Sequence, residues 1–255
     1  MTQIALGVAL ASIVAAAAWR ARALSADGAV AAFVVGAIVF GAAGWQGAAV
    51  LFAFFVPSVV LSRVGRARKG ALLDVEKPGP RDARQVLANG GVAGLCALAA
   101  LRGGPVFVAA FAGAFAAASA DTWGTEVGSL SKKRPVSILT FRTVTPGISG
   151  GITLLGSLAS IGGALAVAFV AALAGVAPLL SVALAGVAGA LLDSVLGASL
   201  QALRWCPACE CECETPRHRC GTQTVMRRGL RWVGNDAVNF CATLCGALVA
   251  GFAVR

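Results

Sequence analysis

The residues of this chain most able to do chemistry are carboxylates set in or beside long apolar stretches. Asp121 and Glu126 lie five positions apart in ADTWGTEVGSLSKKRP, which covers residues 120–135 and ends in a basic cluster. Asp193 lies inside another apolar segment, LLDSVLGASLQ. A carboxylate in apolar surroundings is costly unless it is paired or holds a metal ion. We therefore predict that Asp121 and Asp193 bind Mg²⁺. Glu126 would be the third catalytic carboxylate, either as another metal ligand or as the group that orients the substrate phosphate.

A glycine-rich segment, TFRTVTPGISGGITLLG, leads into the apolar stretch that follows the basic cluster. Gly147, Gly150 and Gly151 surround Ser149, and Arg142 precedes them. Backbone N–H groups at the start of a helix favour anions, although glycines at such a point commonly form only a turn. Beside carboxylates that hold a divalent cation, this segment would supply the remaining parts of a phosphoryl-transfer site, which works mainly by positioning and charge neutralisation.

Amide and acidic side chains also occur at the start of two other apolar segments. RDARQVLANGG contains Asn89, and NDAVNF contains Asp236 and Asn239. These three residues are candidates for binding substrate oxygen atoms. Simpler roles stay open, because Asn235 can cap a helix and Asp82 can pair with a neighbouring arginine.

The composition is that of an integral membrane protein. The chain is 58% hydrophobic and 13% charged, with a mean hydropathy of +0.83, whereas about a quarter of an ordinary soluble domain is charged. We predict an all-α fold, a polytopic bundle of about eight transmembrane helices that forms a single domain over residues 1–255. The apolar stretches are 2–18, 29–44, 46–62, 86–101, 105–120, 148–172, 179–200 and 236–253.

The basic residues indicate the orientation of the helices. All but two of the 21 Lys and Arg residues fall in alternate connections, and the exceptions are Arg102 and Arg255. The positive-inside rule then predicts external termini and a cytoplasmic active face on a multi-pass protein of the cell (inner) membrane. Arg20 and Arg22 follow the first apolar stretch, which favours a retained helix over a cleaved signal. The sequence has no long basic helix, so we predict no nucleic-acid partner.

Five of the eight cysteines and the only histidine lie in a predicted cytoplasmic loop over residues 204–232, in RWCPACECECETPRHRCG. The spacing is typical of a structural zinc site, and the reducing compartment makes disulfides the less favoured use. The predicted Zn²⁺ ligands are Cys206, Cys209, His218 and Cys220, with Cys211 and Cys213 as alternatives.

Several of these motifs together resemble an integral membrane family, once a domain of unknown function, that includes plant phytyl-phosphate kinase. The resemblance runs from about residue 28 to 253 and is carried by RDARQVLANGG, ASADTWGTEVGSLSKKRP, TVTPGISGGITLLGSLAS, LLDSVLGASLQ and NDAVNF. It implies a kinase that converts a prenyl monophosphate to the diphosphate with a nucleoside triphosphate, which is CTP in the plant case.

The motifs and the resemblance together predict a prenyl-phosphate kinase whose partners are the bilayer, a prenyl phosphate and a nucleoside triphosphate. Mg²⁺ would be bound by Asp121 and Asp193, the nucleotide phosphates by Arg142, Gly147, Ser149, Gly150 and Gly151, and substrate oxygens by Asn89, Asp236 and Asn239. The lipid chain would lie between helices. Two alternatives remain: a transporter or lipid carrier that uses the same carboxylates, and a membrane scaffold without chemistry.

Overall fold

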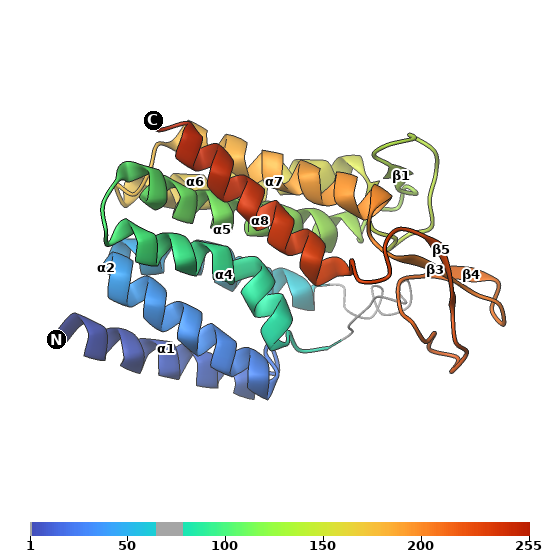
Figure 1. Cartoon of the computed structure of the whole chain (residues 1–255), viewed down its shortest axis with the longest axis horizontal. Helices are drawn as coiled ribbons and strands as arrows, with labels where there is room; N and C mark the ends of the chain where they lie inside the picture. Colours follow the sequence, from blue (N-terminus) through green and yellow to red (C-terminus); the bar gives the residue numbers. More distant parts are fainter. Residues whose placement is uncertain (1, 65–78) are drawn as a thin grey trace.

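A bundle of apolar helices makes up most of the molecule (Figure 1). The computed structural model describes residues 2–64 and 79–255, and this part of the chain contains seven helices. They are α1 (Thr2–Arg20), α2 (Ala26–Arg63), α4 (Ala83–Ala100), α5 (Pro105–Gly128), α6 (Leu154–Leu173), α7 (Leu179–Ser199) and α8 (Asn235–Phe252). Six of them are long and apolar enough to cross a membrane. The predicted helical membrane bundle is confirmed.

The long helix α2 consists of two arms that fold back on each other. Its 38 residues would extend about 57 Å as a straight helix. Gly44 instead has φ 58° and ψ −147°, which breaks the helix, and the Arg63 guanidinium at its end donates a hydrogen bond to the Ala21 carbonyl before its start. The two arms are the predicted stretches 29–44 and 46–62, which is why eight apolar stretches give seven helices.

Helix α5 lies at the centre of the bundle and packs against α4, α6, α7 and α8. Every residue from 109 to 120 is buried. Phe115 stacks on Phe54 of α2, with ring centroids 5.5 Å apart. Gly113 meets Gly246 of α8 so closely that a Cβ on Gly246 would lie 2.5 Å from the Gly113 carbonyl oxygen. Small residues thus let the backbones approach, as expected for helices in lipid.

Two predicted helix boundaries were wrong by about two turns. Helix α5 continues past residue 120 to Gly128, so that Asp121 and Glu126 lie within the helix. Gly124 makes this extension possible, because its missing side chain leaves room for Ser160 of α6. Helix α6 begins at Leu154 rather than at residue 148, since the glycine-rich segment forms a strand before the helix starts.

Five short strands gather at one end of the bundle (Figure 1). The strands β1 (Val136–Ser137) and β2 (Gly151–Ile152) pair antiparallel, and β3 (Leu203–Cys206), β4 (Cys211–Cys213) and β5 (Val225–Arg228) form a sheet in the order β4-β3-β5. The strands are a small addition to the all-α prediction.

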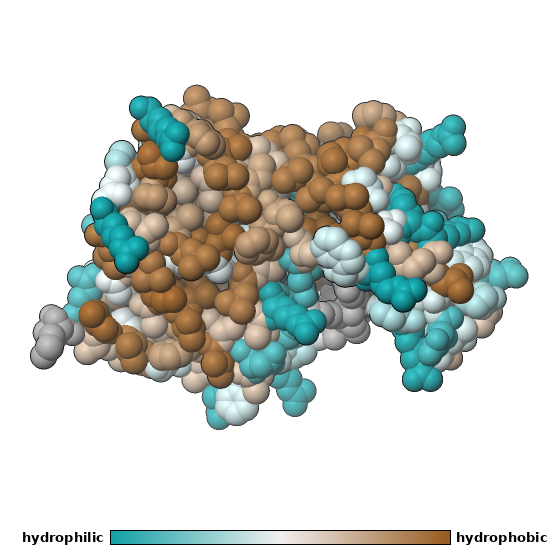
Figure 2. All heavy atoms as spheres, in the orientation of Figure 1, coloured by the Kyte–Doolittle hydropathy of each residue, from teal (hydrophilic) through white to brown (hydrophobic). Residues whose placement is uncertain are grey.

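The described polar connections share this end, whereas both termini lie at the opposite end of the helices (Figure 1). Hydrophobic side chains cover the helices, and hydrophilic ones gather over β3–β5 (Figure 2). This separation agrees with the charge pattern in the sequence. The basic residues Arg66, Arg68, Lys69 and Lys77 of one predicted cytoplasmic connection lie outside the described residues.

Candidate functional site

Asp121 of α5 and Asp193 of α7 form a pair inside the bundle. Their carboxyl groups lie close enough to interact electrostatically, although the residues are 72 positions apart in the sequence. Asp193 Oδ2 is buried and has no hydrogen-bond partner within the described part of the chain. Two adjacent carboxyl groups must share a proton or hold a cation, because two bare negative charges at this distance repel. The pair fits Mg²⁺, which binds one or two protein carboxylates together with substrate phosphates.

Arg81 lies close to Asp121 of this pair, and sequence reasoning did not single it out. Its backbone N–H donates to the Ala23 carbonyl at 3.0 Å, and its carbonyl accepts the Ser25 N–H at 3.0 Å. Burial lowers the pKa of the Arg81 guanidinium, and the negative charges of Glu126 and Asp121 oppose that shift. The negative charge of Glu126, the predicted third catalytic carboxylate, thus stabilises the positive charge of Arg81. A cation fixed next to two carboxylates can orient an anionic substrate.

Asp121 also lines a cavity of about 450 Å³ between the ends of α5, α6 and α7, which we call the polar cavity because many of its lining residues are polar or charged. Three basic residues line it: Lys132, Lys133 and Arg134. The first turn of α6, capped by Thr153, lines it as well. Cationic side chains and the positive end of a long helix both favour phosphate groups. The cavity therefore favours phosphate groups, although the carboxylates of Asp121 and Glu214 also line it.

The glycine-rich loop lines this cavity, but some of its groups have structural roles. Ser149 donates its N–H to Glu214 at 2.7 Å, and its hydroxyl donates to the same carboxylate at 3.1 Å. Gly150 has φ +79°, and a Cβ there would lie 2.4 Å from the Ala198 backbone nitrogen. This N–H and this glycine hold the loop against α7 and the Cys/His loop. Gly147 and Gly151 also line the cavity, and their role towards a nucleotide stays a prediction.

Glu214 is the second residue that sequence reasoning missed. It comes from the Cys/His loop, is only 7% exposed, and also accepts a hydrogen bond from Gln201 at 2.9 Å. Its negative charge lies close enough to act on Asp193. The available sequence signal was the alternation of Cys and Glu in CECECE, which has the period of a strand. Nothing in that pattern distinguishes Glu214 from its neighbours.

The remaining predicted binding residues lie away from the polar cavity. Among the described residues that line it, Arg142, Asp236 and Asn239 do not occur. Arg142 is exposed to solvent, and Asn239 is buried within α8. Asn235 does line the cavity, and the cap of α8 is Gly234 rather than Asn235. Other polar residues near the start of a helix have plain structural roles, since Asp82 caps α4 in a capping box with Gln85.

The predicted metal ligands come together in the Cys/His loop. Ligand atoms of Cys206, Cys209, His218 and Cys220 all lie within 4.8 Å of one another. His218 Nδ1 lies 3.0 Å from Cys220 Sγ, and Cys206 Sγ lies 3.6 Å from it. The spacing argument thus identified a cluster that can hold a metal ion. That the ion is Zn²⁺ stays a prediction.

The chemistry of the cluster suits a metal. Hydrogen bonds with Thr222 and His218 lower the pKa of Cys220 to about 6, which favours the thiolate that metals bind. All eight cysteines are free thiols. Of the alternative ligands, Cys211 Sγ lies 3.6 Å from His218 Nε2, whereas Cys213 is buried outside the cluster.

Comparison with known proteins agrees with this architecture. The profile of the family described as Integral membrane protein DUF92 matches residues 9–247. The chain belongs to this family. It is the family suggested by the sequence motifs, which includes plant phytyl-phosphate kinase, and the resemblance is thereby confirmed.

Relatives occur in plants and archaea. The chain is 29% identical to Protein PGR of Arabidopsis thaliana over 96% of this chain and 94% of that protein. It is 29% identical to an uncharacterized membrane protein of Methanocaldococcus jannaschii, covering 90% of this chain and 85% of the relative. Protein VTE6, chloroplastic, of Arabidopsis thaliana is 28% identical over 89% of this chain and 64% of its own length. No solved structure matches the chain.

Proposed function

We propose that this protein is a membrane phosphotransferase that makes a prenyl diphosphate from a prenyl monophosphate and a nucleoside triphosphate. One observation carries the proposal. Asp121 lines the polar cavity, and its negative charge stabilises the Arg81 cation. Arg81 in turn lines a separate apolar cavity. A single carboxylate therefore connects a space suited to nucleotide phosphates with a space suited to a lipid. Membership of a family that includes phytyl-phosphate kinase supports the same reaction, with CTP as the favoured nucleotide.

The chain's own residues have distinct roles in this reaction. Lys132, Lys133 and Arg134 bind the phosphates of the nucleotide at the start of α6. Arg81 orients the phosphate of the lipid. Mg²⁺, held by Asp121 and Asp193, would neutralise charge on the transferring phosphoryl group.

The chemical step needs no strong base. An oxygen of the prenyl phosphate attacks the γ-phosphorus of the nucleotide and forms a new P–O bond. The bond between the γ-phosphorus and the oxygen that links it to the β-phosphate breaks, and the nucleoside diphosphate leaves with the electron pair. The attacking phosphate is already ionised at neutral pH, so catalysis is mainly positioning and charge stabilisation. The only histidine, His218, belongs to the metal cluster and takes no part in this step.

The Cys/His cluster has a structural role in this proposal. With Zn²⁺ bound, it would fold the loop that carries Glu214, and Glu214 holds the glycine-rich loop at the polar cavity. We propose that the active face is cytoplasmic, because the basic connections gather at that end of the bundle.

Replacing Asp121 with Asn tests the proposal. The amide keeps the shape of the side chain and removes the charge, so the variant should fold and insert like the wild type. Prenyl-phosphate kinase activity should fall by about a hundredfold or more, the usual scale for a lost electrostatic stabiliser. The assay uses protein in nanodiscs with Mg²⁺, labelled CTP or ATP, and prenyl phosphates of several lengths, and it reports activity per folded molecule.

Glu210→Gln is the control, because Glu210 is an exposed carboxylate of the Cys/His loop. Its activity should match the wild type. Normal specific activity in Asp121→Asn would end the catalytic interpretation of this residue. Ion flux or lipid transfer across the bilayer that depends on Asp121, without any phosphotransfer, would support the transporter alternative instead.

A further inference from the structure

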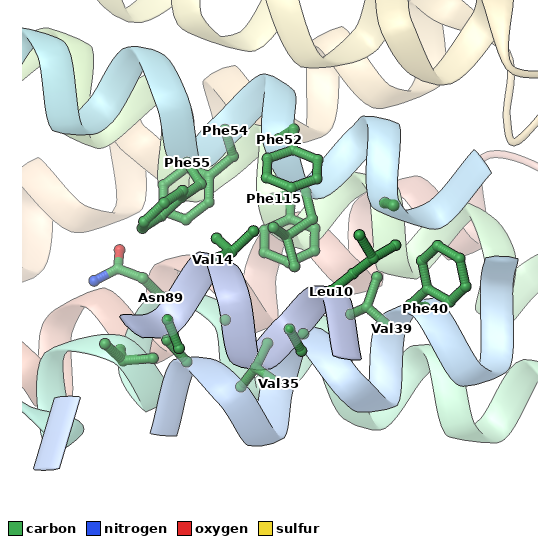
Figure 3. Close-up of a pocket in the computed structure, with 18 of the residues that line it drawn as sticks. Leu10, Val14, Val35, Val39, Phe40, Phe52, Phe54, Phe55, Asn89 and Phe115 are labelled. Atoms are coloured by element: carbon green, nitrogen blue, oxygen red, sulfur yellow. The ribbon is translucent and has the colours of Figure 1, made fainter. Parts of the chain in front are cut away.

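A second cavity, of about 150 Å³, lies between α1, the two arms of α2 and α4. Its walls are mostly hydrophobic side chains from elements far apart in the sequence. They include Leu10 and Val14 of α1, Val35 and Val39 of the first arm of α2, and Phe52 and Phe55 of the second arm. Figure 3 shows these side chains between Asn89 at one end and Phe40 at the other. The cavity is mostly apolar, and it lies in the membrane-spanning part of the bundle.

One end of this cavity is polar. Three of its lining residues carry a charged or amide side chain: Arg81, Gln85 and Asn89. Both amides already have local hydrogen bonds. The Asn89 side-chain amide donates to the backbone carbonyl of Gln85 at 2.9 Å, and the Gln85 side-chain oxygen accepts the backbone N–H of Asp82 at 3.0 Å. Arg81 is the charged member, and a guanidinium matches the geometry of a phosphate. The cavity thus complements an amphiphile with an apolar chain and an anionic head.

The position of Arg81 is fixed by its backbone. Its backbone N–H and carbonyl are hydrogen-bonded to Ala23 and Ser25, and the carbonyl also accepts a hydrogen bond from the Ser25 hydroxyl at 3.1 Å. Gly28 packs against this carbonyl so closely that any side chain there would collide with it. Arg81 is therefore held where the apolar cavity meets the carboxylates of α5, and a phosphate bound to it would face Asp121.

We infer that the apolar cavity binds the isoprenoid chain of the lipid substrate, with the lipid phosphate at Arg81 and the far end of the chain at Phe40. This inference rests on the proposed function and assigns its lipid subsite to α1, α2 and α4. In a bilayer, apolar contacts give little driving force because lipid tails are equally apolar. Selection must therefore come from the shape of the cavity and from the head group.

The far end of the cavity limits the length of the chain. Phe40 is 4% exposed and meets Trp45 edge-on, with ring centroids 4.8 Å apart. Gly7 packs on the Phe40 ring, where a Cβ would lie 2.8 Å from Cδ1. Gly7 and Ala15 both line the cavity and are eight residues apart on α1, a separation of about 12 Å along the helix. Short prenyl chains fit this length better than long polyprenols do.

Photo-crosslinking locates the lipid directly. The probe is farnesyl phosphate with a diazirine on its terminal isoprene unit, added to the protein in phosphatidylcholine nanodiscs without nucleotide or Mg²⁺. Because the diazirine is at the far end of the chain, we expect labelled peptides from the parts of α1 and α2 around Phe40. Ala32→Phe, which fills the cavity, should lower labelling at least tenfold. Ala37→Phe is the matched control, because Ala37 lies on the same arm, is also half-buried and does not line the cavity.

Two further variants separate the head group from the chain. Arg81→Gln should lower labelling by farnesyl phosphate at least tenfold and leave labelling by a farnesol probe unchanged. Phe40→Ala should shift the preference from farnesyl phosphate towards geranylgeranyl phosphate, because it lengthens the cavity. An equal loss of both probes in Arg81→Gln, or an unchanged length preference in Phe40→Ala, would overturn the assignment.

The outcomes distinguish this inference from the proposed function. Labelling in the cavity without any phosphotransfer would refute the kinase proposal and leave the lipid site standing. Normal phosphotransfer with labels only on α5 to α8 would refute the lipid site and leave the kinase standing. Phosphatidic acid that displaces the probe as well as farnesyl phosphate does would show a general phospholipid site and overturn the isoprenoid assignment.

Discussion

Replacing Glu214 with Ala should release the glycine-rich loop from the rest of the site. The Glu214 carboxylate accepts three hydrogen bonds: from the Ser149 N–H at 2.7 Å, the Ser149 hydroxyl at 3.1 Å and the Gln201 amide at 2.9 Å. The side chain is 7% exposed, and Gln201 is 2% exposed. Water therefore cannot easily replace the lost acceptor.

The size of the effect follows from these contacts. A hydrogen bond to a charged group contributes about 1.5–3 kcal/mol, and a buried donor left unpaired costs about 1–3 kcal/mol. The three contacts share one side chain, so their contributions do not add fully. We expect the free energy of local opening to fall by about 3 kcal/mol, which corresponds to roughly hundredfold faster opening at about 1.4 kcal/mol per factor of ten.

Hydrogen–deuterium exchange measures this opening, with mass spectrometry of the peptide that contains Ser149. Exchange at this amide should speed up about a hundredfold in Glu214→Ala, because it would be governed by local opening of the loop. The KM for the nucleotide should also rise, since the loop lines the polar cavity.

Glu212→Ala is the matched control for this experiment. Glu212 comes from the same strand region, but it accepts from the exposed Thr145 hydroxyl at 3.1 Å and pairs with the half-exposed Arg227 at 3.5 Å. Such exposed contacts contribute about 0–1 kcal/mol. Exchange at Ser149 that stays at the wild-type rate in Glu214→Ala, or that rises equally in Glu212→Ala, would refute the reasoning.

Two further predictions concern the metal cluster and the orientation of the chain. Purified protein should contain about one zinc ion per chain, as measured by elemental analysis, and Cys209→Ser should lose it whereas Cys96→Ser keeps it. Metal-free protein with freely titratable loop thiols would exclude the zinc site. A reporter fused after Arg255 should be external and one inserted after Lys133 cytoplasmic, and two reporters on the same side would contradict the charge argument.

The sequence was sufficient for the membrane architecture and for the metal cluster. Apolar stretches are local properties of the chain, and a membrane requires each one to satisfy its backbone hydrogen bonds within itself, so hydropathy predicts the helices directly. The break near Gly44 could be predicted in the same way. The ligands from Cys206 to Cys220 lie within one short loop, so their spacing in the sequence already constrains their spacing in space.

The sequence also identified Asp121 and Asp193, because a carboxylate in an apolar segment is rare and needs an explanation. It could not show that the two form a pair, since that depends on how α5 packs against α7. The helix ends were misjudged for a related reason. Hydropathy falls at Asp121, but the helix continues to Gly128 because small residues let it pack on α6.

Only the tertiary structure brought Arg81 and Glu214 into the site. Arg81 is one of many basic residues in its connection, and Glu214 is one of several carboxylates between cysteines. Each acts through partners far away in the chain: Arg81 on Asp121, and Glu214 on Ser149. The apolar cavity is likewise formed by α1, α2 and α4 together. The sequence gives the chemical type of each residue, but packing between distant segments determines which residues become its neighbours. A functional site depends on both.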